Sequence, residues 1–281
     1  MARTPTEGEL EGLRRHFEIE RELADRLRKA PKERRKHLYA EVYAELFRRV
    51  EMPGNAAAQR AQVGLLLELL EPLLDGVETF LEIGAGACEL SLALAERLDR
   101  VWAVAAVDPE MDPGRTPDGF TFVPDGEFEE SVPADGVDLA LSCHLVEHLH
   151  PDDLRDHLST VLGKLTGGGA YAVVTPNRLY GPHDISRYFS DEPLGFHLRE
   201  YSHIELAAEL ERAGFDPVRV MRRIGESPAA GSRRWVAAAE RVLDALPVPV
   251  RRWCLERAPR AEPFRPLEQV KLVGFKPEGR G

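Results

Sequence analysis

The stretch Leu81-Glu82-Ile83-Gly84-Ala85-Gly86-Ala87-Cys88 decides how the rest of this sequence is interpreted. It ends an apolar run that begins at Val77 and predicts a buried strand, and a helical pattern follows it to about Leu98. Glycines in a strand-to-helix turn let the backbone approach a ligand closely, and the helix beyond offers free N–H groups. Gly84 and Gly86 are therefore candidate ligand-binding residues, and the alternative is that they only make a tight turn.

An acidic residue stands where such a ligand would need one. Asp108 closes the next predicted strand, twenty-two residues after Gly86. A carboxylate at the tip of this strand can accept hydrogen bonds from both hydroxyls of a ribose. We therefore predict that the turn and Asp108 bind a nucleoside. The structural alternative is that Asp108 caps the loop that begins at Pro109.

Predicted strands and helices alternate from residue 77 onward. One helix opens at Pro151 and closes at the glycine turn 167–169, and another runs from Ile204 to Ala213. Alternation at this spacing implies βαβ units. We predict an α/β fold, Rossmann-like, with a seven-stranded, mostly parallel sheet and helices on both faces. The predicted strands are 77–83, 101–107, 120–123, 136–141, 170–174, 218–223 and 270–275.

Two helical regions lie outside this alternation. Residues 1–76 are amphipathic and predict an N-terminal helical extension or lid, in which Thr4-Pro5-Thr6-Glu7 has the form of a capping box. Residues 225–265 predict an Arg-rich helical insert before the final strand. The remaining residues, 77–224 and 266–281, make up the predicted core that binds the nucleoside.

The composition narrows the class of protein. The 281 residues are 43% hydrophobic and 30% charged, which is too apolar for general disorder and suits one large α/β domain with additions. No segment approaches the roughly 20 apolar residues of a membrane span, and no secretory signal is evident. Three cysteines without a CxxC pair fit a reducing cytosol. We expect a cytoplasmic protein, and the preference for Arg over Lys fits a bacterial source.

The charge is unevenly distributed. The net charge of −11 argues against a protein that simply binds duplex nucleic acid. Residues 219–260 nevertheless hold ten Arg against four acids, whereas residues 111–160 hold twelve acids against two Arg. The basic segment could meet an anionic partner, but a solvated helical appendage is the favoured interpretation.

Two residues around the glycine turn indicate which nucleoside it binds. A dinucleotide fingerprint needs a third glycine at position 89, where this sequence has Glu89. Glu82 suits a ligand with a cationic amino group instead. The stretch resembles motif I of the class I S-adenosylmethionine-dependent methyltransferases. The resemblance covers roughly residues 77–223 and the final strand, and it implies S-adenosylmethionine as the cofactor.

The same resemblance assigns further cofactor residues. Glu82, Gly84 and Gly86 match motif I, and Asp108 matches the ribose-binding acid of the family. Asp125 takes the place of the acid that contacts adenine, although Glu127 is close enough to compete.

Two segments are expected at the site of methyl transfer, which lies beyond the carboxyl ends of the strands. Residues 135–142 and 145–149 resemble the motif after strand four in the ubiquinone and menaquinone methyltransferase branch. Cys143, between them, is expected beside the cofactor, and His144 is a candidate catalytic residue. The protein must align the acceptor with the methyl group and often remove its proton.

The second segment is the long connection after the fifth strand, which we interpret as an acceptor-binding lid. His183 is the candidate general base, with Asp184 as the acid that orients it. The alternative is a loop histidine that is hydrogen-bonded to the backbone. Arginines of this segment could hold a carboxylate or phosphate of the substrate. The candidate substrate-binding residues are His197, Tyr201, Arg178 and Arg199.

The segment after strand four also raises the question of a metal. His144-Leu145-Val146-Glu147-His148 spells H-x-x-E-H, but the zinc-protease signature of that form needs a long helix, which this position lacks. The ubiquinone O-methyltransferases carry a similar E-x-x-E-H stretch that is associated with a divalent ion. By that resemblance His144, Glu147 and His148 are candidate ligands of a metal softer than magnesium. The alternative is that Glu147 and His148 pin the following helix. Candidates for a further ligand are His183, Asp184 and His197.

These residues together predict a methyltransferase that acts on a small-molecule acceptor. Oxygen is the favoured atom because a histidine base suits a phenol or hydroxyl group. An N- or C-methyltransferase of specialised metabolism is a close alternative. Two others are an RNA or protein methyltransferase that docks through the basic insert, and an inactive cofactor-binding scaffold subunit. We expect no membrane partner and disfavour nucleic acid, while the oligomeric state stays open, a homodimer included.

Overall fold

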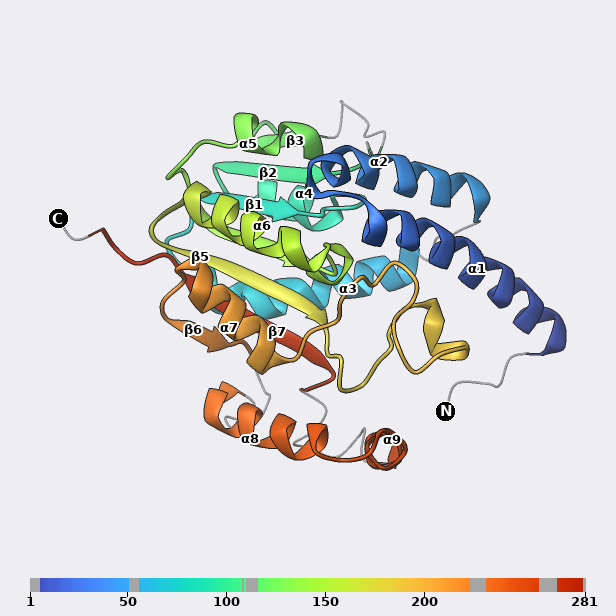
Figure 1. Ribbon diagram of the computed structural model, residues 1–281. Helices are drawn as coiled ribbons and strands as arrows, with labels where there is room; N and C mark the ends of the chain where they lie inside the picture. The colour runs from blue at the N-terminus through green and yellow to red at the C-terminus, as the bar shows by residue number, and fades with distance from the viewer. Residues whose placement is uncertain are drawn as a thin grey trace.

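The computed structural model describes residues 6–50, 56–107, 109, 116–222, 231–257 and 267–279. Within these residues, seven strands form one sheet in the order β3-β2-β1-β4-β5-β7-β6 (Figure 1). This confirms the predicted α/β, Rossmann-like fold with a mostly parallel sheet. The strands are β1 Thr79–Ile83, β2 Arg100–Ala105, β3 Phe120–Pro124, β4 Val137–Cys143, β5 Leu165–Pro176, β6 Val218–Val220 and β7 Gln269–Phe275.

The order of the strands fixes where a ligand can bind. β1 pairs in parallel with β2 on one side and with β4 on the other, so the chain changes direction across the sheet between β1 and β4. β3 and β5 extend the parallel part, whereas β7 runs antiparallel between β5 and β6. Open α/β sheets bind ligands outside the carboxyl ends of the strands at such a switch point. The glycine turn after β1 and the segment after β4 flank that point.

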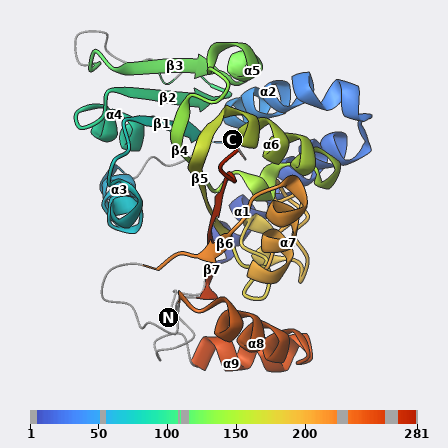
Figure 2. The ribbon, with the colours of Figure 1, turned by 90° about the vertical axis from the view of Figure 1, so that its left-hand side faces the viewer.

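Helices cover both faces of the sheet, because its central strands carry apolar side chains on both sides. α3 (Ala56–Leu70) and α4 (Glu89–Ala95) share one core cluster with the strands. α6 (Pro151–Lys164) and α7 (His203–Ala213) share another cluster on the opposite face. Figure 2 shows the two layers, with α3 and α4 to the left of the strands and α6 and α7 to the right.

The N-terminal helices form a hairpin that is fixed to the core. α1 (Glu7–Lys29) and α2 (Lys32–Arg49) lie side by side (Figure 1) and enclose a small apolar cluster, which Phe196 from the connection after β5 completes. Arg35, which is buried, joins α2 to α6 through two hydrogen bonds of 2.7 Å to Asp153. Arg28 on α1 donates to backbone carbonyls between residues 193 and 197, in the connection after β5. The hairpin is therefore hydrogen-bonded both to α6 of the core and to the connection after β5.

The start of α1 differs from the prediction. Thr6 is the N-cap: its side chain accepts from the N–H of Glu9, and the Glu9 carboxylate accepts from the N–H of Thr6. Thr4 lies outside the described residues. The sequence pattern alone does not choose between the two threonines, because each has a glutamate three residues later.

The glycine run 167–169 belongs to β5, although we predicted it as the turn that ends the preceding helix. α6 ends at Lys164 and β5 begins at once, with an irregular register where it pairs with the first residues of β4. Gly168 has a φ of 82°. A Cβ on Gly169 would lie 3.0 Å from backbone oxygens of neighbouring residues. The glycines therefore allow a bulge and a close approach of two strands.

The described part of the insert contains α8 (Arg233–Asp244) and α9 (Val248–Arg257). Both lie beyond the edge of the sheet formed by β6 and β7 (Figure 2). Arg178, directly after β5, donates to both carboxylate oxygens of Asp244 at 3.0 and 2.8 Å and to Glu205 of α7 at 2.7 Å. This clamp joins the insert to the core.

Short helical turns complete the fold. They are η1 Glu71–Leu73, η3 Asp125–Glu127, α5 Phe128–Ser131, η4 Val146–His148 and η5 Ile185–Tyr188.

No helix in the described part of the chain is long and apolar enough to cross a membrane.

Candidate active site

The glycine turn between β1 and α4 is held against the neighbouring strand, because the N–H groups of Gly84 and Ala85 both donate to the carbonyl of Val104 at 2.9 Å. Gly84 has a φ of 79°, and a Cβ there would lie 3.2 Å from the Leu145 side chain. Gly86 has a φ of 52°, and a Cβ there would meet no atom within 4 Å. Gly84 is therefore required by packing as well as by its backbone, whereas Gly86 opens onto free space where the ligand is expected.

Glu82, inside β1, is a buried carboxyl that accepts a hydrogen bond of 2.5 Å from the Ser91 hydroxyl. Burial raises the pKa of Glu82 to about 7, and the hydrogen bonds from Ser91 oppose this only in part. Among the described residues no cation pairs with it. An ammonium group that approached this carboxyl would stabilise its charged form. By the resemblance drawn from the sequence, Glu82 and the open space at Gly86 would hold the amino-acid end of S-adenosylmethionine.

The other predicted cofactor residues lie at different distances from the glycine turn, and one of them is outside the described residues. Asp108 lies outside the described residues. Asp125 begins the exposed turn η3 directly after β3, which is separated from β1 by β2. Cys143 is the last residue of β4, beside β1 at the switch point. Burial raises the pKa of the Cys143 thiol to about 12, so it is not a nucleophile.

His144 and Glu147 pair directly after β4. His144 has a φ of 54°, which histidine rarely adopts, and its Nδ1 lies 3.1 Å from Oε1 of Glu147. Oε2 of Glu147 accepts a hydrogen bond of 2.8 Å from the Thr175 hydroxyl on β5. Burial acts to raise the pKa of Glu147, but the hydrogen bond from His144 and the nearby histidines lower it to about 2. Glu147 is therefore ionised, and it accepts a hydrogen bond from Nδ1–H of His144, which leaves Nε2 on the side of the ring away from the carboxylate.

The ring of His144 faces a pocket of about 630 Å³ at the carboxyl ends of β4 and β5, which we call the His144 pocket. The His144 side chain is 38% exposed, and its Nε2 lies 3.5 Å from the amide nitrogen of Gln269. Leucines of α3 form an apolar part of the wall. The other lining residues include Gln62, Cys143, Pro176, His183, Glu268 and Lys271.

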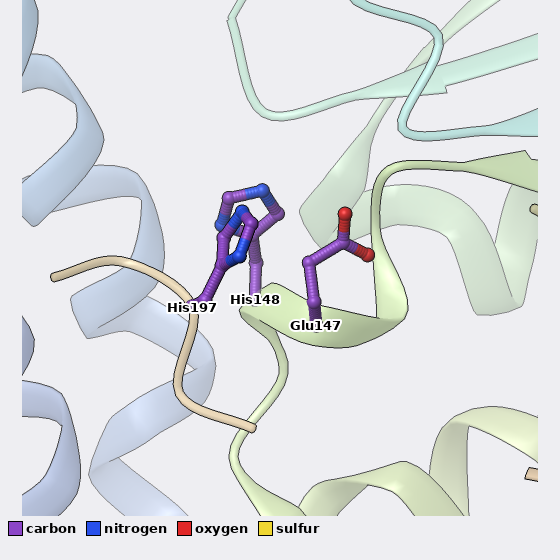
Figure 3. A group of neighbouring side chains, drawn as sticks. All are labelled: Glu147, His148 and His197. Carbon is purple, nitrogen blue, oxygen red and sulfur yellow. The ribbon is translucent and has the colours of Figure 1, made fainter. Parts of the chain in front are cut away.

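Three side chains lie close together: Glu147 and His148 from η4 and His197 from the connection after β5 (Figure 3). Their candidate ligand atoms all lie within 4.8 Å of one another. Nδ1 of His148 donates to the carbonyl of Phe196 at 3.1 Å, and Nδ1 of His197 lies 2.7 Å from Oε1 of Glu200. Both rings therefore keep Nε2 for another partner, as metal-ligating histidines do. His197 takes the place in this group that we had predicted for His144.

The pKa values of the two histidines of this group shift in opposite directions. Burial lowers the pKa of His148 to about 4, so it is neutral at pH 7. Burial also opposes a charge on His197, but its hydrogen bond to Glu200 and the charge of Glu147 raise its pKa above the usual value. Tyr43 of α2 packs against His148, with ring centroids 6.2 Å apart. The N-terminal hairpin therefore closes the group from one side.

His183 lines the His144 pocket but is not oriented by Asp184, contrary to our expectation. Its backbone N–H donates to Glu200 at 2.7 Å, and its Nε2 lies 3.1 Å from the carbonyl of Asn177. Nε2 of His183 therefore carries the proton. Asp184 instead accepts hydrogen bonds of 2.9 Å from two backbone N–H groups farther along the same connection. It shapes the loop.

Three of the residues predicted to contact substrate instead pack or pair within the protein. Arg178 is the clamp that joins α8 to α7. Tyr201 is fully buried in the core cluster, and its hydroxyl has no hydrogen-bond partner among the described residues. The guanidinium of Arg199 lies 4.9 Å from the centroid of the Tyr201 ring. Neither Arg178 nor Tyr201 reaches the His144 pocket, and His197 belongs to the buried group described above.

Sequence reasoning missed three polar residues of this site. Glu200 joins the backbone of His183 to the ring of His197. Thr175 comes beside Glu147, and Gln269 comes beside His144, because β5 and β7 follow β4 in the sheet. The only sequence signal was a polar residue at the end or start of an apolar strand, and such residues are common.

Comparisons with known proteins agree with this architecture. A family model described as "Methyltransferase domain" matches residues 19–220. A SAM-dependent methyltransferase from Archaeoglobus fulgidus is 19% identical with a TM-score of 0.50, over 77% of this chain and 94% of that chain. The [4+2]-cyclase SpnF is 20% identical with a TM-score of 0.50, over 82% of this chain and 86% of that chain.

Phosphoethanolamine N-methyltransferase 2 from Haemonchus contortus is 14% identical with a TM-score of 0.50, over 76% of this chain and 53% of that chain. At these identities the solved structures show a shared fold, and they differ in the reactions that they are named for. A search of curated proteins finds no match.

Proposed function

Because this chain belongs to the methyltransferase domain family, with the fold of the class I S-adenosylmethionine-dependent enzymes, we propose that it methylates a hydroxyl oxygen of a small-molecule acceptor with His144 as the general base. The pair formed by His144 and Glu147 carries this proposal. It presents Nε2 of His144 to a pocket at the carboxyl ends of the strands, where the fold supports methyl transfer.

S-adenosylmethionine, when bound, supplies the methyl group and leaves as S-adenosylhomocysteine. An acceptor hydroxyl in the His144 pocket would give its proton to Nε2 of His144 as its oxygen takes the methyl group. The carboxylate of Glu147 stabilises the imidazolium that results. We prefer His144 to His183, the base predicted from the sequence, because His144 is held by a carboxylate, which stabilises an imidazolium, whereas His183 donates from Nε2 to a neutral backbone carbonyl.

The test measures the release of S-adenosylhomocysteine over a range of pH with a panel of phenols, catechols and amines. We expect His144→Gln to lower turnover about 100-fold or more, since general bases contribute on the order of 100- to 10,000-fold. His37→Gln, an exposed histidine on α2, is the matched control and should leave turnover unchanged.

A His144→Gln enzyme with normal turnover and an unchanged pH profile would contradict the role of His144. Turnover with amines alone, unaffected by that variant, would favour the N-methyltransferase alternative. His183→Gln separates the two histidines, because we expect it to change the affinity for the acceptor more than the pH profile.

Docking of RNA or protein through the insert has less support. Some of the described arginines of the insert have acidic partners: Arg233 pairs with Glu211, and Arg252 lies 2.7 Å from Asp191. These pairs neutralise part of the local positive charge. Electrophoretic retention of RNA that fades steeply with salt would revive the alternative.

A divalent ion at Glu147, His148 and His197 is a second candidate feature, supported by their geometry. Two imidazole nitrogens and one carboxylate favour zinc, cobalt or iron over magnesium, and such an ion would act there as a Lewis acid. Elemental analysis and Co²⁺ absorption spectra test the site. We expect His197→Gln to abolish binding and His144→Gln to preserve it. Retention of the ion by His197→Gln would contradict this ligand set.

A further inference from the structure

A second pocket, of about 460 Å³, opens beside the His144 pocket. One wall comes from the connection after β5, at residues 179–188, and another comes from α9 of the insert. His183 and Glu268 line both pockets, so the two spaces lie next to each other. The insert therefore borders the proposed site of methyl transfer. We call this second space the Arg pocket.

Positive charge predominates among the described residues that line the Arg pocket. Arg187, Arg251 and Arg252 contribute guanidinium groups, and Glu268 is the one acid among the lining residues. Arg187 donates to the hydroxyl of Tyr188 at 3.0 Å, and its guanidinium lies 4.8 Å from the centroid of that ring. Within the described part of the chain, no carboxylate forms an ion pair with Arg187.

Arg251 is only partly compensated. Its side chain is 14% exposed, and its nearest acid, Asp244, lies 3.6 Å away. Both oxygens of Asp244 already accept hydrogen bonds from Arg178 at 3.0 and 2.8 Å. A guanidinium has five N–H donors, so Arg251 keeps donors for a further acceptor. Arg252 pairs with Asp191 at the surface, where such pairs contribute little.

The remaining lining of the Arg pocket is largely apolar or aromatic. Leu179 and Tyr180 lie on the wall from the connection after β5, and Val248 and Leu255 lie on the wall from α9. The space therefore suits a molecule with an apolar or aromatic body and an anionic group. Neither a bare inorganic ion nor a neutral polar molecule would use both features.

We infer that the Arg pocket binds a carboxylate or phosphate group of the acceptor while the acceptor's hydroxyl lies in the His144 pocket. Arg187 and Arg251 are the residues that select for this group, because guanidinium groups bind both anions bidentately. The acceptor class is thus a hydroxylated aromatic or apolar acid. This inference rests on the proposed function and names the substrate class for the same site.

The experiment titrates two anionic probes, 4-hydroxybenzoate and phenyl phosphate, and the neutral probe phenol into the full chain with S-adenosylhomocysteine present. Isothermal calorimetry should show that at least one anionic probe binds about tenfold more tightly than phenol, as expected for one charge-assisted hydrogen bond. Arg187→Gln should remove most of that difference, and Arg187→Gln with Arg251→Gln should remove it fully. Arg155→Gln, on the exposed side of α6, makes the same change in charge and should have no effect.

Three results would overturn the inference. They are equal affinity for the anionic probes and phenol, unchanged affinity in Arg187→Gln, and inorganic phosphate binding as tightly as phenyl phosphate. Arg187 is exposed, so its variant does not depend on a change in folding. Calorimetry needs no turnover, so a failure of methylation with every acceptor would contradict the proposed function and leave the Arg pocket in place.

Discussion

Glu82 and Glu147 are both buried glutamates, one in β1 and one directly after the neighbouring β4, yet their pKa values shift in opposite directions. Burial raises the pKa of Glu82 to about 7, with Ser91 as the donor of its hydrogen bonds. Burial acts on Glu147 in the same way, but His144 and the nearby histidines lower its pKa to about 2, and Thr175 donates to its other oxygen. Burial alone favours the neutral acid, and only donors and positive neighbours keep a charge inside a protein.

The two glutamates differ in whether their charged form depends on a ligand. Glu147 has its partners within the chain, so the orientation of His144 is set before any ligand binds. Glu82 has no cationic partner among the described residues, so its charged form depends on a ligand. The end of the site that we assign to the cofactor is therefore completed by binding, whereas the end that we assign to the base is preorganised.

The largest expected effect comes from removing the charge of Glu147. We expect Glu147→Gln to lower turnover about 100-fold or more, because the amide cannot stabilise the imidazolium of His144. Steady-state release of S-adenosylhomocysteine measures the loss, and calorimetry should show unchanged affinity for S-adenosylmethionine. Glu41→Gln, exposed on α2, is the matched control. Normal turnover in Glu147→Gln would contradict the pairing.

The opposite pKa shifts predict opposite dependences of stability on pH in chelator-treated, cofactor-free protein. The folded pKa of Glu82 is about 7 against the ordinary 4.5, so its contribution to stability is full below pH 4.5 and is lost as pH rises to about 7. The folded pKa of Glu147 is about 2, so its contribution is full above pH 4.5 and is lost as pH falls toward 2.

Urea unfolding at several pH values tests this contrast. Relative to the wild type, Glu82→Gln should gain roughly 3 kcal/mol in free energy of unfolding between pH 4.5 and 7, from a shift of about two and a half pKa units. The deficit of Glu147→Gln should shrink as pH falls from 4.5 toward 2. Parallel profiles for wild type and Glu82→Gln would show that Glu82 titrates normally.

The two glycines of the turn should respond differently to alanine. Gly84→Ala should lower the free energy of unfolding by about 2 kcal/mol. The new methyl group would crowd the Leu145 side chain, and alanine would also be strained at a positive φ. Gly86→Ala should cost about 1 kcal/mol, from strain alone. Calorimetry should nevertheless show weaker binding of S-adenosylmethionine by Gly86→Ala. A Gly86→Ala protein with normal affinity would mean that this side of the turn does not face the cofactor.

The smallest expected effect concerns the backbone of His144. Both His144→Gly and His144→Ala should be inactive, but glycine relieves the strain at a φ of 54°. We expect His144→Gly to be more stable than His144→Ala by about 1 kcal/mol in urea unfolding. An equal or higher stability for His144→Ala would show that the left-handed conformation at this position carries no strain.

Local patterns were enough to predict the sheet and the glycine turn. Each predicted strand is an apolar run a few residues long, and its bounds in the structure differ mainly at the ends. The exception is β5, where the glycines 167–169 look like a turn to a local pattern but form a bulge against the start of β4. The N-cap of α1 was misplaced because two threonines satisfy the same spacing.

The partners of the site residues were beyond such patterns. Asp184 follows His183 directly, but the extended backbone turns its carboxyl toward the N–H groups of its own loop. Glu200, seventeen residues away, contacts His183 instead. Arg178 is sixty-six residues from Asp244, and nothing in the spacing indicates that the two side chains meet.

The sequence by itself determined the strands, the helices and the turn, because these depend on neighbours within a few residues. It also supplied both buried glutamates, but not their opposite charge states. Those were decided by tertiary structure: strand pairing brings Thr175 beside Glu147, and the connection after β5 brings His197. A carboxylate's pKa depends on which groups surround it in space, and chain distance does not specify that.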